Sequence, residues 1–223
     1  MTISAARKPR PTKRNIDVGR RAQIGVEKRA RTRKAILESA FTLIGHDRGL
    51  STRIEEVCEA AGISRGTFYN YFNSIEELFD ALSYELNHDF NTAVTEFLNS
   101  LPTAAERCGA AVRYYLSRAL KDPKWAWAMV HISAAGPIFG ADTYSHAEAT
   151  AAQGAVSGEF DAPANVGRDI QLGITLSAMM TQLKDPSLTT YPETITRHVL
   201  RALGVSAARI EEIASQPLPG IDA

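Results

Sequence analysis

Apolar residues recur along most of the chain at the three- and four-residue spacing of helices, and no segment shows the alternation of a half-buried strand. The clearest row runs from Ile75 to Leu101, and it predicts a single long helix that Pro102 ends. At 1.5 Å per residue this helix would span on the order of 35–40 Å, enough to join a head to a separate body. The pattern therefore predicts an all-α fold.

Residues 51–78 predict two short helices joined by a tight turn, followed by the start of the long helix. The first helix carries one apolar stripe at i, i+3, i+4 and i+7, made by Ile54, Val57, Cys58 and Ala61. Thr52 and Glu55 match a capping box, which marks the start of that helix. Gly62 ends it, because glycine enters the left-handed conformation without steric cost. Ser64 is then placed to cap the second helix, residues 64–72.

The residue pattern of the second short helix predicts that it is firmly anchored and has a polar outer face. Phe68 and Phe72, four residues apart, can pack on the first helix, and Gly66 allows another backbone to approach closely. The outward residues are Arg65, Thr67, Asn70 and Tyr71. Short polar groups and an arginine on a small helix suit the major groove of B-DNA, so the pair is typical of a helix-turn-helix unit. The alternative is a generic helical hairpin with a polar surface.

The remaining apolar rows predict further helices on both sides of this unit. A helix at about residues 27–46 precedes it, with a buried side made by Ile36, Leu37, Ala40, Phe41, Leu43 and Ile44. After Pro102 we expect one helix before the Asp122-Pro123 break and a second ending at Gly136-Pro137. Four more are expected at about 141–156, 169–183, 193–203 and 206–214, with a loop bracketed by Pro186 and Pro192.

Charge is distributed unevenly, although the net charge of the 223 residues is zero. Residues 1–35 hold twelve basic and two acidic residues, a net +10, which leaves −10 on the rest. The segment before the first helix contains Pro9, Pro11 and Gly19, and we expect it to be a disordered arm. Beside a helix-turn-helix such an arm suits DNA phosphates or the minor groove, although a merely solvated tail remains the alternative.

Other classes of protein find little support in the sequence. No run reaches the roughly 18 apolar residues of a membrane helix, and the polar start lacks a signal-peptide core, so we expect a cytoplasmic protein without membrane contact. Cys58 and Cys108 fall in helical patterns, which favours small buried side chains over redox or metal roles. The histidines are scattered (His46, His88, His131, His146 and His198), and no catalytic or nucleotide-binding motif is present. We predict no enzyme activity, metal or cofactor.

The run Ala61–Ser74, AGISRGTFYNYFNS, with Ser51-Thr52 and the apolar-patterned helix before it, resembles the tetracycline-repressor (TetR) family over about residues 30–80. The resemblance implies base contacts from Arg65, Gly66, Thr67 and Asn70, and phosphate contacts from Thr52, Tyr69 and Tyr71. With neighbouring polar and basic groups, the predicted DNA-binding set is Arg31, Arg33, Thr52, Arg53, Ser64, Arg65, Gly66, Thr67, Tyr69, Asn70 and Tyr71. Two positions depart from the family pattern, since Ile75 replaces a common lysine and Glu55 a common arginine.

The same resemblance implies a homodimer formed through the last long helices and a small-molecule cavity in the body. We predict residues 169–183 and 193–203 for the dimer interface, with an intramolecular core as the alternative. For the cavity, aromatic and sulfur-containing residues indicate an apolar or aromatic effector; the predicted ligand-binding set is Tyr115, Trp127, Met129, His131, Phe139, Tyr144, Thr175 and Met179. The implied domains are a basic arm (1–26), a helix-turn-helix DNA-binding domain (27–73), a helical regulatory and dimerisation domain (74–216) and a tail (217–223).

Three functional hypotheses follow. The first is a dimeric repressor that binds a palindromic, double-stranded DNA operator and is released by a small-molecule inducer. The second is an architectural or constitutive DNA-binding regulator without an effector. The third is a helical enzyme or adaptor whose basic arm only meets RNA or a membrane, and it predicts no sequence preference in DNA binding.

Overall fold

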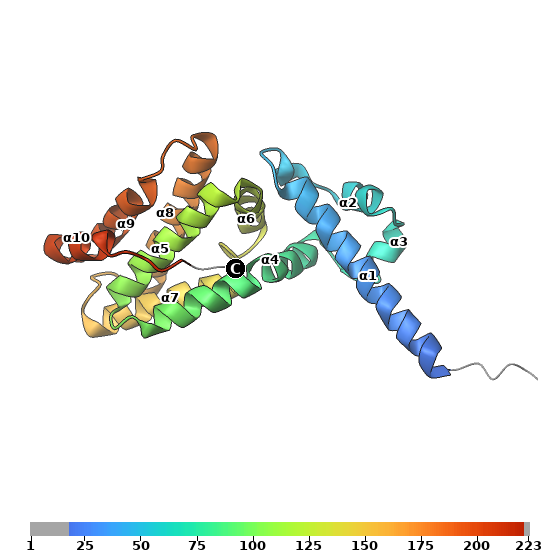
Figure 1. The fold of residues 1–223 in the computed structure, drawn as a ribbon, viewed down its shortest axis with the longest axis horizontal. Helices are drawn as coiled ribbons and strands as arrows, with labels where there is room; N and C mark the ends of the chain where they lie inside the picture. Colours follow the sequence, from blue (N-terminus) through green and yellow to red (C-terminus); the bar gives the residue numbers. More distant parts are fainter. Residues whose placement is uncertain (1–17, 221–223) are drawn as a thin grey trace, which may run out of the picture.

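The structure, a computed structural model, describes residues 18–220, and this part of the chain contains ten α-helices, one short 3-10 helix and no strand (Figure 1). The all-α prediction is confirmed. The elements are α1 (Val18–Ile44), η1 (Gly49–Ser51), α2 (Ile54–Ala61), α3 (Arg65–Phe68), α4 (Ile75–Ser100), α5 (Ala104–Lys121), α6 (Pro123–Ala135), α7 (Ala141–Ser157), α8 (Ala164–Lys184), α9 (Tyr191–Ala202) and α10 (Ala207–Ser215).

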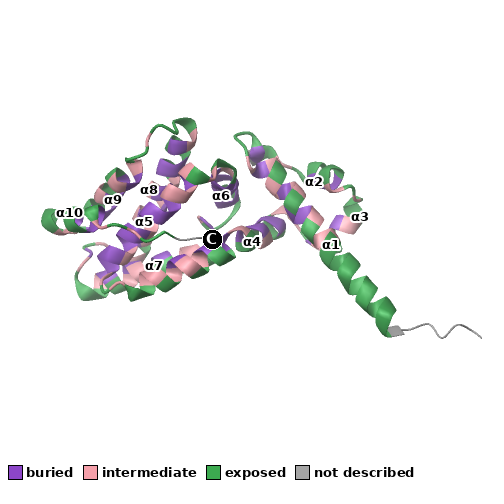
Figure 2. Cartoon of the chain, viewed as in Figure 1, coloured by how far each residue is buried: buried purple, intermediate pink, exposed green. Residues whose placement is uncertain are grey.

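The long helix α4 joins two parts of the molecule, a head made by α1–α3 and a body made by α5–α10 (Figure 1). It holds 26 residues, which corresponds to about 39 Å. Ser74 caps its start by accepting a hydrogen bond from the Glu77 N–H at 3.2 Å, and Pro102 follows its end. Buried residues occur in both halves of α4, from Leu78 to Val94 (Figure 2). The predicted connecting helix is therefore confirmed.

Helix α1 begins at Val18, nine residues before the expected start at Glu27. Residues 18–26, which we expected to be disordered, are helical, and residues 1–17 lie outside the described range. The prediction gave too much weight to Gly19. Each of the two glycines in this segment, Gly19 and Gly25, costs a helix only about 1 kcal/mol, and the arginine, alanine and glutamine residues between them are good helix formers. Residues 18–26 therefore form the first turns of α1, which project beyond the rest of the head (Figure 1).

The helix-turn-helix has the expected order but differs in two details. Arg53, not Thr52, is the N-cap of α2, and Glu56 accepts a hydrogen bond from the Arg53 N–H at 2.7 Å. The predicted Thr52–Glu55 capping box is wrong by one residue, which leaves the Glu55 carboxylate available for another partner. Helix α3 has four residues and continues into a turn, so it is shorter than the expected helix 64–72.

Helix α5 is central to the body, where α4, α7, α8, α9 and α10 pack around it. Its buried residues include Cys108, whose thiol pKa is raised by burial to about 12, in agreement with an unreactive core position. At Gly109 an added Cβ would lie 2.7 Å from the Ile213 side chain, so glycine allows α10 to approach α5 closely.

Helix α8 begins five residues earlier than expected, and the apolar row within the predicted interface segment 169–183 (Leu172, Leu176, Met179 and Leu183) faces inward. Leu172 and Met179 are buried in the core, and Leu176 and Leu183 are partly buried against it. Pro192, expected in a loop, lies in the first turn of α9, where proline is tolerated because its missing N–H has no helical partner. The predicted apolar row on α8 therefore belongs to the intramolecular core.

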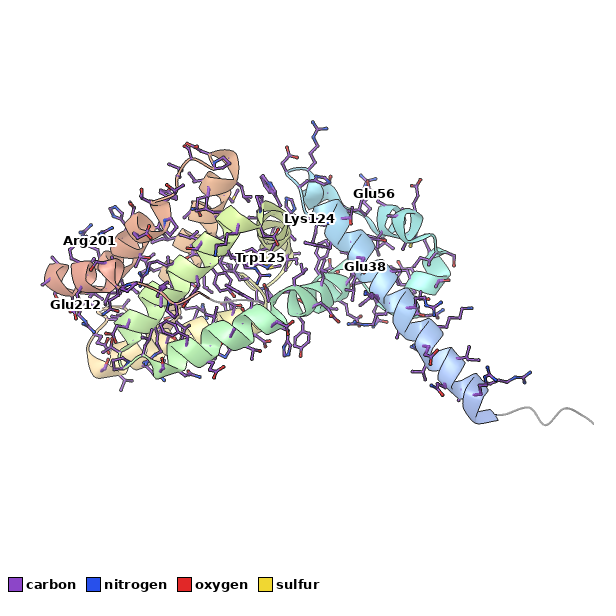
Figure 3. The ribbon with its side chains drawn as sticks, viewed as in Figure 1. Glu38, Glu56, Lys124, Trp125, Arg201 and Glu212 are labelled. Carbon is purple, nitrogen blue, oxygen red and sulfur yellow. The ribbon has the colours of Figure 1, made fainter. Side chains whose placement is uncertain are left out.

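The head contacts the body where α6 meets the end of α1. His131 Nδ1 lies 2.8 Å from the Ile44 carbonyl oxygen, and Trp127 stacks on the His131 ring with 5.7 Å between ring centroids. Lys124, at the start of α6, reaches towards α1, where its ammonium lies 4.3 Å from the centroid of the Phe41 ring (Figure 3). This contact fixes the angle of the head independently of α4.

Burial lowers the pKa of His131, and the nearby His46 adds to this effect, whereas the bond to the Ile44 carbonyl and the charge of Asp47 oppose it. As the pH falls below 6.5, the unfolded chain therefore takes up a proton at this histidine before the folded chain does. The free energy of unfolding then decreases as the pH falls. Between pH 7 and 5.5 we expect a loss of at most about 1 kcal/mol from this residue, measured by urea unfolding. His131→Gln should remove that slope, and exposed His146→Gln should retain it; equal slopes in both variants would contradict this prediction.

Candidate nucleic-acid interface and ligand cavity

The predicted DNA-reading residues of positions 52–71 lie on the surface of the helix-turn-helix. Arg53, Ser64, Arg65, Gly66, Tyr69 and Asn70 are exposed, and Thr52, Thr67 and Tyr71 are partly exposed. An added Cβ at Gly66 would meet only the Ser64 hydroxyl, at 3.9 Å, so the helix surface is open there. The outer face of α3 can thus approach another molecule closely.

Aromatic packing and caps make α3 rigid despite its length. Phe68 and Phe72 are buried, with 5.9 Å between their ring centroids. The Ser64 hydroxyl accepts a hydrogen bond from the Thr67 N–H at 3.1 Å, which confirms the predicted cap. Gly62 takes the left-handed conformation, with φ of 65°, and confirms the predicted turn. A short helix held in this way presents its polar groups in one geometry.

Helix α1 contributes a cation that the sequence analysis missed. The Arg29 guanidinium donates a hydrogen bond to the Asn70 carbonyl at 3.3 Å and lies 5.6 Å from the centroid of the Tyr71 ring. Predicted Arg33 instead pairs with Glu85 of α4 at 3.0 Å, and predicted Arg31 is exposed. Residues two apart project to nearly opposite sides of a helix, so Arg31 lies away from α3. The four-residue spacing of Arg29 and Arg33 could have indicated their common side.

An ion pair links the two short helices on this outer face. Arg65 Nη1 of α3 lies 2.8 Å from Glu55 Oε1 of α2, and both side chains are more than half exposed. The pKa of the Arg65 guanidinium is raised, first by hydrogen bonding with the Tyr69 side chain and next by the charge of Glu55. Arg65 is thus a predicted DNA-reading residue that is paired with a carboxylate of the neighbouring helix.

A narrow cavity of about 50 Å³ lies in the body between α4, α5, α7 and α8. By the measure in which one water needs about 10–15 Å³, it has room for a few waters only. Most of the wall is apolar, with polar groups at several points; the lining residues are Asn91, Val94, Thr95, Leu98, Ala111, Val112, Tyr115, Phe139, Thr143, His146, Ala147, Thr150, Gln171, Leu172 and Thr175. Such a surface suits a small, mainly apolar ligand with a few polar atoms.

Three polar side chains of the cavity form a closed ring of hydrogen bonds. The Tyr115 hydroxyl donates to Asn91 Oδ1 at 2.7 Å, and Asn91 Nδ2 donates to Thr143 Oγ1 at 3.1 Å. The Thr143 and Tyr115 hydroxyls are 2.7 Å apart, which completes the ring if Thr143 donates. Burial raises the pKa of Tyr115 to about 12, so the phenol stays protonated at neutral pH. The ring connects α4, α5 and α7.

Gln171 of α8 brings an unused hydrogen-bond acceptor to the cavity. Its side chain is 6% exposed, and Gln171 Oε1 is buried without a hydrogen-bond partner in the described part of the chain. A buried acceptor left unpaired costs about 1–3 kcal/mol. A ligand that donates a hydrogen bond to this oxygen would remove that cost.

Three of the eight predicted ligand-binding residues line this cavity, namely Tyr115, Phe139 and Thr175. The others lie elsewhere: Trp127 and His131 at the head–body contact, Met129 and Met179 in the core, and Tyr144 beneath the Arg168 guanidinium. The prediction missed Asn91, Thr143 and Gln171, because polar residues within helices usually indicate a solvated face.

The cavity wall is also tied to α4 through Asn87. Trp125 Nε1 donates to Asn87 Oδ1 at 2.9 Å, and Asn87 Nδ2 donates to the carbonyl oxygen of Phe139 at 3.3 Å. Trp125 points into the body from the start of α6 (Figure 3). Phe139 takes a positive φ of 59°, and an added Cβ on its neighbour Gly140 would lie 2.1 Å from the Ser83 hydroxyl. The α6–α7 turn is therefore clamped on α4.

Within residues 18–220, no three His, Cys, Asp or Glu side chains gather closely enough to hold a metal ion. Across the same range, each helix is too short or too polar to cross a membrane.

Comparison with models of known protein families finds a match in the head and another in the body of the chain. The model for bacterial regulatory proteins of the tetR family matches residues 36–82, and the model for a tetracyclin repressor-like C-terminal domain matches residues 103–216, about half of the chain. Among curated proteins, none matches the sequence.

Solved structures give similar results. RolR in complex with resorcinol is 29% identical, with a TM-score of 0.68, and covers 88% of this chain and 100% of its own. RolR without ligand is 28% identical, with a TM-score of 0.65, and covers 84% and 98%. FadR from Bacillus subtilis in complex with stearoyl-CoA is 18% identical, with a TM-score of 0.55 over 76% of this chain and 96% of its own, a likeness of fold alone.

Proposed function

The chain belongs to the TetR family of bacterial transcription regulators, and from this premise we propose that it is a repressor released from a palindromic operator by a small phenolic ligand. Proteins of this family are DNA-binding and generally non-enzymatic. The observation that carries the proposal is the hydrogen-bonded ring of Asn91, Tyr115 and Thr143. It links the cavity directly to α4, the helix that also carries the head.

On the DNA side, α3 and the turn that follows it supply base contacts, and the surrounding groups supply phosphate contacts. Asn70 and Arg65 carry side chains that can bond to base edges, and Thr52 and Tyr69 have hydroxyls for phosphates. Arg29 lies at the same edge and brings a positive charge to the backbone of the duplex. One such unit reads only a few base pairs, so two units about 34–36 Å apart would multiply specificity.

A homodimer would supply the second unit, and α8 offers a surface for it. The face of α8 opposite the core exposes Val166 and Met180 by 43% and 38%, and Ile170 and Ile174 are only partly buried. An added Cβ at Gly173 would meet nothing within 4 Å, which leaves room for a partner helix to approach closely. Apolar exposure of this kind on one helix supports a self-complementary interface.

The chemistry of the cavity wall suits a ligand that consists of one aromatic ring with hydroxyl groups. RolR was solved with resorcinol, a dihydroxybenzene, at 29% identity to this chain. Here the Tyr115 and Phe139 rings, whose centroids are 5.0 Å apart, together form an aromatic part of the wall on which a ligand ring can pack, and Gln171 Oε1 can accept a phenolic hydrogen bond.

Release from DNA would follow from the small size of the cavity. A ligand ring needs more space than is present, so its entry must separate α7 from α4 or open the ring of Asn91, Tyr115 and Thr143. Either change alters the path of α4 and hence the spacing of two heads in a dimer. A hundredfold preference of the ligand for the altered form corresponds to about 2.7 kcal/mol, enough to weaken operator binding substantially.

Sequences selected from random DNA by the protein should contain a palindrome with half-site centres about 34–36 Å, or a multiple of that spacing, apart.

Arg29→Gln should reduce affinity for all sequences and lower the log–log salt slope by about 0.9 for each phosphate that is no longer neutralised, because Arg29 faces the α3 edge. Arg31→Gln, on the other side of α1, is the matched control and should change the slope less. A larger effect of Arg31→Gln would place the DNA on the other side of α1.

Met180→Lys should weaken the dimer by at least tenfold, because it adds a charge to the exposed apolar face of α8. Val156→Lys introduces the same charge on α7, at an apolar residue that is 90% exposed, and serves as the control. Sedimentation equilibrium of both variants measures the effect. Unchanged dimerisation in Met180→Lys would exclude this face of α8 as the interface.

Resorcinol, tested beside phenol and catechol, should release the protein from its selected DNA, measured by fluorescence anisotropy. Gln171→Leu should weaken the response about two- to tenfold, because the ligand then makes one neutral hydrogen bond fewer. Gln182→Leu is the control, since Gln182 is a buried glutamine on α8 whose side-chain amide has no hydrogen-bond partner within residues 18–220 and does not line the cavity. Failure of these and other small phenols to weaken DNA binding would favour a constitutive regulator without an effector.

A further inference from the structure

We propose that Glu55 is a specificity-determining residue of the DNA interface, which positions Arg65 for a base edge and keeps it away from phosphates. The inference rests on the proposed function, because it concerns how the same helix-turn-helix reads its operator. Glu55 would act through Arg65 and is therefore a positioning residue rather than a direct reader of DNA.

The local geometry leaves Glu55 available for this role. Because Arg53 caps α2 and Glu56 bonds to the Arg53 N–H, the Glu55 carboxylate takes no part in the cap. It lies 2.8 Å from Arg65 Nη1, across the turn between α2 and α3. The two residues are ten positions apart, so the pair joins two helices and is not a product of one helix's own spacing.

The pair changes what the Arg65 guanidinium can bind. An unpaired arginine on this face would be attracted to any phosphate, and that attraction adds affinity without sequence preference. The Glu55 carboxylate repels phosphates and offsets the charge of Arg65, so this non-specific attraction is reduced. A guanidinium has five N–H donors, and Glu55 engages one nitrogen, which leaves donors for the two acceptors of guanine, O6 and N7.

The pair also limits the conformations that Arg65 adopts before DNA binds. A free arginine side chain loses conformational entropy when it is fixed on a base, whereas the Arg65 side chain is already restrained by its ion pair with Glu55. The donors that remain then point in a defined direction. Arg65 therefore loses less conformational entropy on DNA binding than an unrestrained arginine would. A base that offers no acceptor in that direction is disfavoured.

A simpler possibility gives a different result. If the Glu55–Arg65 pair only masks the arginine and breaks when DNA binds, then removal of the carboxylate raises affinity for all sequences by the same factor. In that case the preference of the protein for one base over the other three stays unchanged. The ratio between selected and random DNA is therefore the quantity that separates the two possibilities.

The experiment measures affinity for the selected operator, for single-base variants of it and for random duplex DNA, with wild-type protein and with Glu55→Gln. We expect Glu55→Gln to bind random DNA more tightly, with a steeper salt dependence. The base preference at one position of each half-site should fall about tenfold, and that at the other positions should stay. Arg65→Ala should abolish the preference at the same position, and Glu55→Gln should have no further effect on it in the Arg65→Ala background.

Glu59→Gln is the matched control, because it removes the same charge from an exposed position of the same helix. Thermal unfolding of each variant verifies that the fold is retained. Equal behaviour of Glu55→Gln and Glu59→Gln, or a gain in affinity with an unchanged base preference, would overturn the inference and leave the proposed function intact. A wild-type protein that selects no palindrome would overturn both.

Discussion

The structure depends on α4 being packed in both the head and the body. Asn87, in the middle of this helix, accepts a hydrogen bond from Trp125 of α6 and donates one to the carbonyl oxygen of Phe139 in the α6–α7 turn. Both bonds are buried, where a broken pair would leave unsatisfied polar groups. The helix therefore cannot shift in the body without a change at this turn, and the turn contributes Phe139 to the cavity wall.

In the function that we propose, this constraint couples the cavity and the DNA-binding head with few specialised parts. The cavity touches α4 at Asn91, one turn beyond Asn87, and the head is built on the first turns of the same helix. The contact of His131 with the Ile44 carbonyl gives the head a second attachment to the body. Coupling between ligand and DNA then requires a difference in free energy between two positions of α4 and no separate signalling pathway.

The sequence predicted the fold well because its helices have strong local signals. Gly62 and the Ser64 cap place the turn before α3, and Pro102 ends α4 where expected. The sites were harder to predict, because they depend on pairs that only the tertiary structure brings together. Asn91 is a polar residue within an apolar row, and nothing in its neighbours indicates a partner on α5 or α7. The shift of one residue in the α2 cap similarly decided whether Glu55 was free to meet Arg65.

The central claim, that DNA binding and the cavity are coupled through α4, is tested most directly by hydrogen–deuterium exchange with and without the selected operator. No ligand is needed, because coupling is reciprocal and DNA must alter the cavity if a ligand is to alter DNA binding. We predict changed exchange at residues 87–95 of α4 and residues 139–147 at the start of α7, in addition to the head. Changes confined to residues 18–73 would contradict the coupling and leave a head that binds DNA independently of the cavity.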